Sequence, residues 1–189
     1  MGSHWKRRDV LALGALGGLH RAAAQEKPAR IGVIGTGSRG TGLVRTLLDV
    51  EGVEIPALCD INEANLKRAS DAVEKAGRKR PDGYPDYRRL ISREDLDAVI
   101  VSTPWDLHAR MSIDAMKAGK FVGSEVPAAT TLEECWELVN TSERTGRPCM
   151  LLENVCYFRN VLAVLNMVEQ GVLGELTHCE GGYQHDVRS

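Results

Sequence analysis

Short apolar runs alternate with longer segments whose apolar residues recur every three or four positions between residues 31 and 153. The short runs predict buried β-strands, and the longer segments predict amphipathic helices. We expect strands at 31–34, 53–59, 98–102, 121–124 and 149–153, with helices at 63–77, 105–118 and 132–144. Strands that alternate with helices of about 10 to 15 residues predict an α/β fold, a doubly wound parallel sheet with right-handed crossovers and helices on both faces.

The pattern changes beyond this sheet and in one connection within it. Residues 155–174 predict a helix and residues 175–182 a strand, whereas the segment 81–87, rich in Pro, Gly and Tyr, is expected to be a loop. Because a single strand cannot form a sheet, we expect the chain to be the N-terminal portion of a longer protein, with a truncated second α/β domain. The expected organisation is a leader at 1–27, a first domain with this sheet at 28–153 and the beginning of a second domain at 154–189.

The composition is that of an ordinary globular protein. Of the 189 residues, 43% are hydrophobic and 26% charged, and the formal net charge is −2. Positive and negative charges are interspersed, and the densest basic stretch, 78–80, follows a predicted helix, where a solvated helix terminus is expected. The five cysteines lack the spacing of a zinc site. We therefore expect neither a nucleic-acid partner nor a metal ion.

The first residues resemble an export signal. Lys6, Arg7 and Arg8 precede the apolar stretch 10–19, and small residues follow at 22–24. Paired arginines, an apolar segment too short to span a bilayer and a small-residue cleavage site predict twin-arginine export of a folded protein, without membrane attachment after signal removal. An amphipathic or disordered leader is the alternative.

A glycine motif follows the first predicted strand. Gly35, Gly37 and Gly40 form Gly-x-Gly-x-x-Gly immediately before a predicted helix. The first glycine permits the turn, the second lets the backbone approach a pyrophosphate, and the third lets helix and strand pack closely. The helix N-terminus then offers free N–H groups to the anion. An ordinary glycine-rich turn is the alternative, but the order of strand, glycines, helix, strand and acid favours a dinucleotide site.

That acid is Asp60, at the end of the second predicted strand. A carboxylate there is expected to hold the ribose hydroxyls of the adenosine half, although it can also cap the following helix. It repels a 2′-phosphate, and neither Ile61 nor Asn62 supplies a guanidinium to receive one. NAD is therefore favoured over NADP, although Arg39 could pair with a phosphate of either cofactor.

Ligands of such sheets lie beyond the carboxyl ends of the strands. Four groups of residues follow predicted strands, at 103–108, 125–127, 153–154 and 183–186. Each also has a structural explanation: Trp105 as core packing, His108 as a first-turn helix residue, Glu125 as an acid beside a helix cap, Asn154 as a turn former and Tyr183 as a strand residue. Their shared location favours a common site.

These residues carry a family resemblance that covers 28–189. The glycine motif, Asp60, the Ser-Thr-Pro sequence with His108, and Glu125-Val126-Pro127 resemble the Gfo/Idh/MocA oxidoreductase superfamily, whose members join a Rossmann domain to an α/β domain with an open sheet. The strings at 35–40, 103–105, 125–129, 152–157, 161–168 and 182–186 resemble glycoside hydrolase family 109, the NAD-dependent α-N-acetylgalactosaminidases. Ordinary dehydrogenases of the superfamily carry lysine where this chain has Val126, which cannot hold a proton, whereas family 109 shares the valine.

The resemblance implies hydrolysis of a small-molecule glycoside through transient oxidation at C3, elimination, water addition and re-reduction, outside the two-carboxylate scheme. Beside the loop glycines Gly35, Gly37 and Gly40, it implies NAD contacts at Ser38, Arg39, Asp60, Trp105, Asp106, Leu107, His108, Glu125, Val126 and Asn154. Tyr183 is the expected substrate contact, and Tyr183 and His185 are the expected acid–base residues.

Two other functions stay open. The chain could belong to an NAD-dependent sugar dehydrogenase of the same superfamily, or it could be a non-catalytic NAD-binding module at this length. The missing part of the second domain would also offer a surface for homo-oligomer formation.

Overall fold

Six parallel strands form one sheet in the order β3-β2-β1-β4-β5-β6, the order of doubly wound dinucleotide-binding folds. The computed structural model describes residues 27–182, so the expected leader lies almost entirely outside the described residues. The strands are β1 (Ala29–Ile34), β2 (Val53–Cys59), β3 (Asp82–Tyr84), β4 (Ala98–Val101), β5 (Phe121–Ser124) and β6 (Cys149–Leu151). The predicted Rossmann sheet is confirmed.

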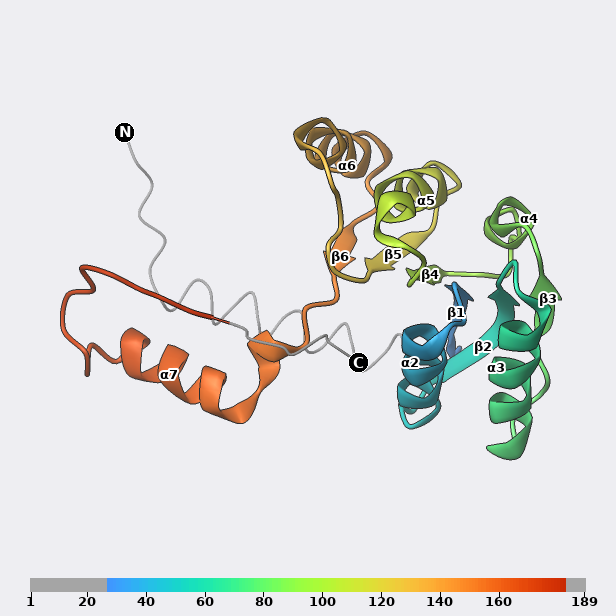
Figure 1. Cartoon of the computed structure of the whole chain (residues 1–189), viewed down its shortest axis with the longest axis horizontal. Helices are drawn as coiled ribbons and strands as arrows, with labels where there is room; N and C mark the ends of the chain where they lie inside the picture. The colour runs from blue at the N-terminus through green and yellow to red at the C-terminus, as the bar shows by residue number, and fades with distance from the viewer. Residues whose placement is uncertain (1–26, 183–189) are drawn as a thin grey trace, which may run out of the picture. The chain divides into compact units, whose positions relative to one another are not determined.

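Helices cover both faces of this sheet (Figure 1). On one face, α2 (Ser38–Leu48) and α3 (Glu63–Lys75) pack on Val33 and Leu58. On the other face lie α4 (Tyr87–Ile91), α5 (Trp105–Lys117) and α6 (Leu132–Thr145), over a core that includes Ile34 and Val99. Adjacent residues of β1 thus enter opposite cores, because successive side chains of a strand point to opposite faces.

Side-chain caps and a glycine mark the ends of two helices. The side chain of Asn62 accepts hydrogen bonds from the backbone N–H groups of Ala64 and Asn65 and begins α3, so Asn62, and not Asp60, is the N-cap. Thr131 and Glu134 form a capping box at the start of α6, and Gly146 follows that helix with φ of +65°.

The predicted loop at 81–87 is wrong in part. Residues 82–84 pair in parallel with residues 57–59 and form the edge strand β3, and α4 begins at Tyr87 behind its N-cap Asp86. Short edge strands tolerate glycine and polar residues, which removes the apolar alternation on which a sequence-based assignment depends.

Residues 153–182 belong to a second unit, which is described here by itself. It contains a 3-10 turn, η1 (Val155–Tyr157), and α7 (Arg159–Glu169), a shorter helix than the one predicted at 155–174 because extended backbone at Phe158 separates the two. The predicted strand at 175–182 is wrong, since no strand forms there. An isolated strand has no neighbour to satisfy its backbone groups, which explains the difference. None of the described helices is long and apolar enough to cross a membrane.

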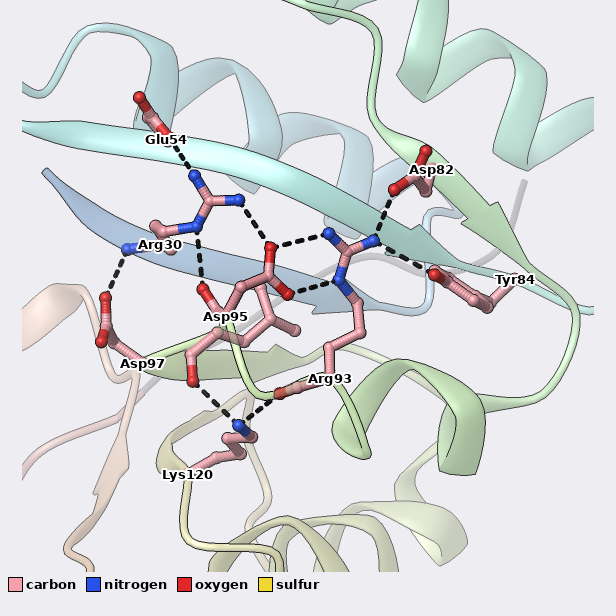
Figure 2. Close-up of polar contacts among 9 residues, drawn as sticks. Arg30, Glu54, Asp82, Tyr84, Arg93, Asp95, Asp97 and Lys120 are labelled. Carbon is pink, nitrogen blue, oxygen red and sulfur yellow. Dashed lines mark hydrogen bonds and ion pairs between the residues drawn. The ribbon is translucent and has the colours of Figure 1, made fainter.

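Charged side chains connect the amino ends of the strands (Figure 2). The Arg30 guanidinium on β1 donates to Glu54 on β2 and to Asp95, which precedes β4. Arg93 donates to Asp95 and to Asp82 at the start of β3, with N···O distances of 2.8 and 2.5 Å. This network joins three strands and the loop before β4, and in it Asp95 accepts hydrogen bonds from both guanidinium groups. The network lies at the amino ends of the strands, whereas the glycine loop lies at their carboxyl ends.

Candidate functional site

The glycine loop meets the end of β4, where the strand order reverses. β1 and β4 are neighbours, yet α2 and α5 leave them toward opposite faces. Gly35 has φ of +86°, and a Cβ atom there would lie 2.6 Å from the carbonyl oxygen of Ser102. A Cβ atom on Gly40 would overlap the carbonyl oxygen of Gly35. Both positions therefore require glycine because backbone atoms approach too closely for a side chain.

Gly37 is different, because a Cβ atom there would meet nothing within 4 Å. It is the N-cap of α2, it supplies no side-chain cap, and the first turn of the helix carries no acidic residue. A helix start with uncapped N–H groups beside open space is suited to a pyrophosphate. The loop thus fits a dinucleotide, because Gly35 and Gly40 are required by the fold and Gly37 keeps space free for the ligand.

Asp60 is bonded to the glycine loop. Its Oδ2 atom accepts hydrogen bonds from the backbone N–H and the hydroxyl of the buried Thr36, at 2.7 and 3.2 Å. Its Oδ1 atom accepts from the N–H of Asn62 at 2.8 Å. A carboxylate offers about four acceptor positions, so Asp60 can hold the loop and still accept a ribose hydroxyl.

Arg39 and Glu125 connect α2 with the end of β5. The Nε and Nη2 atoms of Arg39 each lie 2.6 Å from Oε1 of Glu125. The Glu125 side chain is 8% exposed and that of Arg39 is 53% exposed. The structure thus brings together two predicted cofactor residues from distant parts of the chain.

His108 is fully buried in the first turns of α5, at 1% exposure. Its Nδ1 and Nε2 atoms lie 2.8 and 2.7 Å from the carbonyl oxygens of Pro127 and Thr103. The ring therefore joins the loops that follow β4 and β5. This geometry makes His108 a positioning residue for those loops; contact with a cofactor stays a prediction.

The other predicted contacts of the first unit lie at the same edge. Trp105 begins α5 and is 64% exposed, so it does not serve as core packing. Asp106 is exposed, Leu107 is half-buried, and Ser38 is exposed in the first turn of α2. Val126 lies exposed after β5, beside Glu125. These side chains are available to a ligand at the carboxyl edge of the sheet.

The three remaining predicted residues lie outside the first unit or outside the described residues. Asn154 precedes η1 in the second unit. Tyr183 and His185 lie outside the described residues. A hollow at the amino edge, lined by residues that include Val53, Pro56 and Arg78, contains none of the predicted site residues.

Sequence reasoning missed two residues that shape the loop. Thr36 bonds to Asp60, and Ser102 donates from Oγ to the carbonyl oxygen of Gly35 at 2.7 Å. Both are small hydroxyl residues at strand ends, a position that could have indicated a role in holding a turn. Within residues 27–182, no group of three or more His, Cys, Asp or Glu side chains is arranged to hold a metal ion.

Comparison with known proteins identifies the family. Residues 29–152 match the model of the oxidoreductase family with the NAD-binding Rossmann fold, and residues 157–189 match the C-terminal domain of glycosyl hydrolase 109. An alpha-N-acetylgalactosaminidase of Bacteroides fragilis is 50% identical over 85% of this chain, and a glycosyl hydrolase family 109 protein of Solibacter usitatus is 46% identical over 97%. The chain spans 38% and 47% of the length of these two relatives.

Solved structures agree on the fold. Myo-inositol 2-dehydrogenase from Lactobacillus plantarum matches 79% of this chain and is matched over 43% of its own, with a TM-score of 0.70 and 26% identity. The glycine loop and Asp60 lie where that fold holds a dinucleotide. The chain therefore belongs to the Gfo/Idh/MocA oxidoreductase family with the NAD-binding Rossmann fold, and within it to the branch of glycosyl hydrolase family 109.

Proposed function

We propose that a protein containing this chain and a complete second domain is an NAD-dependent glycosidase that acts on α-linked N-acetylgalactosamine. The observation that carries the proposal is Val126, which occupies the exposed position after Glu125 at the carboxyl edge. A sugar dehydrogenase of this superfamily would need a proton carrier there, and an aliphatic side chain cannot act as one. The 50% identity to an alpha-N-acetylgalactosaminidase supports the same assignment.

The residues of the first unit suit binding and orientation. NAD supplies reversible oxidation at C3 of the sugar when it is bound. The N–H groups at the start of α2 would hold its pyrophosphate and Asp60 its adenosine ribose. Trp105 and Val126, exposed after β4 and β5, would face the reactive half and exclude water from it.

Proton transfer must then come from other side chains. We assign it to the phenol of Tyr183 and a ring nitrogen of His185, with Tyr183 also in contact with the sugar. One residue separates them in the sequence, so an extended backbone would place both on one face. A base beside C2 would remove its proton, which is acidified once C3 is a ketone.

The test is an assay of that longer protein with a chromogenic α-N-acetylgalactosaminide. We expect release of the aglycone with NAD⁺ in catalytic amount and deuterium at C2 of the product in heavy water. The variant Y183F should lower kcat while NADH binding to the Rossmann domain stays unchanged. Aglycone release without C2 exchange would contradict the proposed mechanism.

A sugar dehydrogenase is the second candidate, which the match to myo-inositol 2-dehydrogenase favours. It predicts net accumulation of NADH with a free sugar or polyol and no release of an aglycone. Tight NADH binding without turnover on either substrate would leave a non-catalytic binding module as the function.

A further inference from the structure

A second charged side chain lies beside the predicted ribose site. Arg68 is exposed on α3, and its Nη2 atom donates to the carbonyl oxygen of Thr36 at 3.2 Å and to the side-chain oxygen of Asn65 at 2.9 Å. Among residues 27–182 it forms no ion pair. Its charge is therefore available to a ligand.

Thr36 connects Arg68 with Asp60. The N–H and hydroxyl of Thr36 donate to Asp60, while its carbonyl oxygen accepts from Arg68. One buried residue thus holds an acid and a guanidinium close to each other without pairing them. The sequence alone indicated no guanidinium near Asp60, because Arg68 is in the second turn of the helix that follows it and not directly after the acid.

The residue after Asp60 also suits an adenosine. Ile61 is 92% exposed, which leaves an aliphatic surface uncovered next to the acid. Aliphatic side chains beside a few directed polar groups are typical of cofactor sites. An adenine that covers Ile61 would bring its ribose toward Asp60 and Arg68.

We propose that Arg68 is a second determinant of cofactor choice, a guanidinium that binds the 2′-phosphate of a dinucleotide once the Asp60 carboxylate is neutralised. The Asp60 charge repels a 2′-phosphate, so the natural site selects NAD. Without that charge, the planar guanidinium can form paired hydrogen bonds to phosphate oxygens. The proposal rests on the NAD-binding fold and is independent of the proposed glycosidase activity.

The test compares binding of NADH and NADPH by fluorescence titration, with adenosine 2′,5′-bisphosphate titrated by calorimetry as a probe without nicotinamide. D60N should improve NADPH affinity relative to NADH on the order of tenfold, and D60N/R68Q should lose that gain. Lys67, the neighbour of Arg68 on α3, pairs with Asp71, so D60N/K67Q is the matched control and should keep the gain.

Equal NADPH affinity of D60N and D60N/R68Q would overturn the proposal, as would a gain lost equally in D60N/K67Q. Absence of any gain in D60N would overturn it too. If circular dichroism shows that D60N does not fold, D60S replaces it and is compared with D60S/R68Q. D60S should then gain NADPH affinity relative to NADH and D60S/R68Q should lose that gain, and equal affinity ratios in the two variants would contradict the assignment.

Discussion

Arg39 and Glu125 form an ion pair across the end of β4, with two guanidinium nitrogens 2.6 Å from one carboxylate oxygen. β1 and β5 lie on either side of β4, so the pair connects the glycine loop to the loop of Val126. The two partners differ in burial, because Glu125 is almost covered and Arg39 is half-exposed. Removal of either partner should therefore have different consequences.

Replacement of Arg39 should cost more stability than replacement of Glu125. R39M keeps the aliphatic stem but leaves a buried carboxylate without its cation, which we expect to cost about 2–3 kcal/mol. E125Q leaves an arginine that water can solvate and should cost about 1 kcal/mol. Urea denaturation of both variants and of R39M/E125Q measures the difference. Equal losses, or no recovery in the double variant, would contradict it.

Substitution of Gly37 should weaken NADH binding, whereas substitution of Gly40 should lower the stability of the fold. G37A places a methyl group in open space, so it should leave the thermal midpoint within about 2 °C and weaken NADH binding on the order of tenfold or more. G40A forces an overlap with the Gly35 carbonyl and should destabilise the domain by about 3 kcal/mol. Thermal melts and NADH titrations give both quantities. Unchanged NADH affinity in G37A would argue against a pyrophosphate at this loop.

The features that depend on a few neighbouring residues were predictable from the sequence. Short apolar runs predicted five of the six strands, and the order of strand, glycines and Asp60 indicated the dinucleotide site. β3 was missed because Asp82, Gly83 and Tyr84 form an edge strand through pairing with β2, with no apolar pattern of their own. The strand predicted at 175–182 was wrong for the opposite reason, since its apolar pattern is present but no strand among residues 27–182 pairs with it.

Long-range contacts of the site were not predictable in the same way. Arg39 and Glu125 were each expected to contact NAD, but 86 residues separate them and only the fold shows that they bind each other. A helix cap was the alternative to ribose binding for Asp60, and Asn62 performs that task at α3. For His108, the sequence favoured a cofactor contact and left a first-turn helix residue as the alternative. Its two carbonyl partners depend on the packing of two loops and had no signal in the sequence.

H108F distinguishes these two interpretations of His108. A phenyl ring fills the space but removes both ring nitrogens that lie within hydrogen-bond distance of the carbonyl oxygens of Thr103 and Pro127, so at least one carbonyl oxygen loses its donor, which should cost about 1–3 kcal/mol of stability. A residue that only contacts the cofactor would instead lose NADH affinity at unchanged stability. Urea denaturation with and without NADH separates the outcomes, and Y157F, an exposed aromatic change in the second unit, is the control.

Cys59 should be the slowest thiol of the chain to react. Burial, with the nearby Asp60 and Asp86 carboxylates, raises the pKa of its thiol to about 12. Thiolate is the reactive form, so iodoacetamide at pH 8 should modify exposed Cys135 well before Cys59. Peptide mass spectrometry over time checks this order of modification, and equal modification rates would contradict it.

The same shift makes the stability of the fold depend on pH. Because the thiol of Cys59 ionises at a lower pH in the unfolded chain, its contribution to stability is complete below about pH 8.5 and is lost as the pH rises toward 12.

Asp95 should account for part of the acid sensitivity of the fold. Hydrogen bonds from Arg93 and then Arg30 hold the pKa of its carboxyl below the ordinary value. A carboxyl whose pKa is lower in the folded state contributes stability above its unfolded pKa, about 3.9, and this contribution is lost as the pH falls below that value.

D95N removes the charge and replaces one of the two oxygens that accept from Arg30 and Arg93 in the network of Figure 2 with an NH2 group, which cannot accept. Because the Asp95 side chain is 42% exposed, solvent screens the pairs, and the loss at pH 7 should be about 1 kcal/mol. The free energy of unfolding of D95N should then change less than that of the natural chain between pH 5 and about pH 3. Glu137, whose pair with Lys117 is exposed at 3.6 Å, supplies the control E137Q, which should follow the natural chain at every pH. A D95N curve parallel to that of the natural chain would show that the Asp95 pairs do not distinguish the folded from the unfolded state.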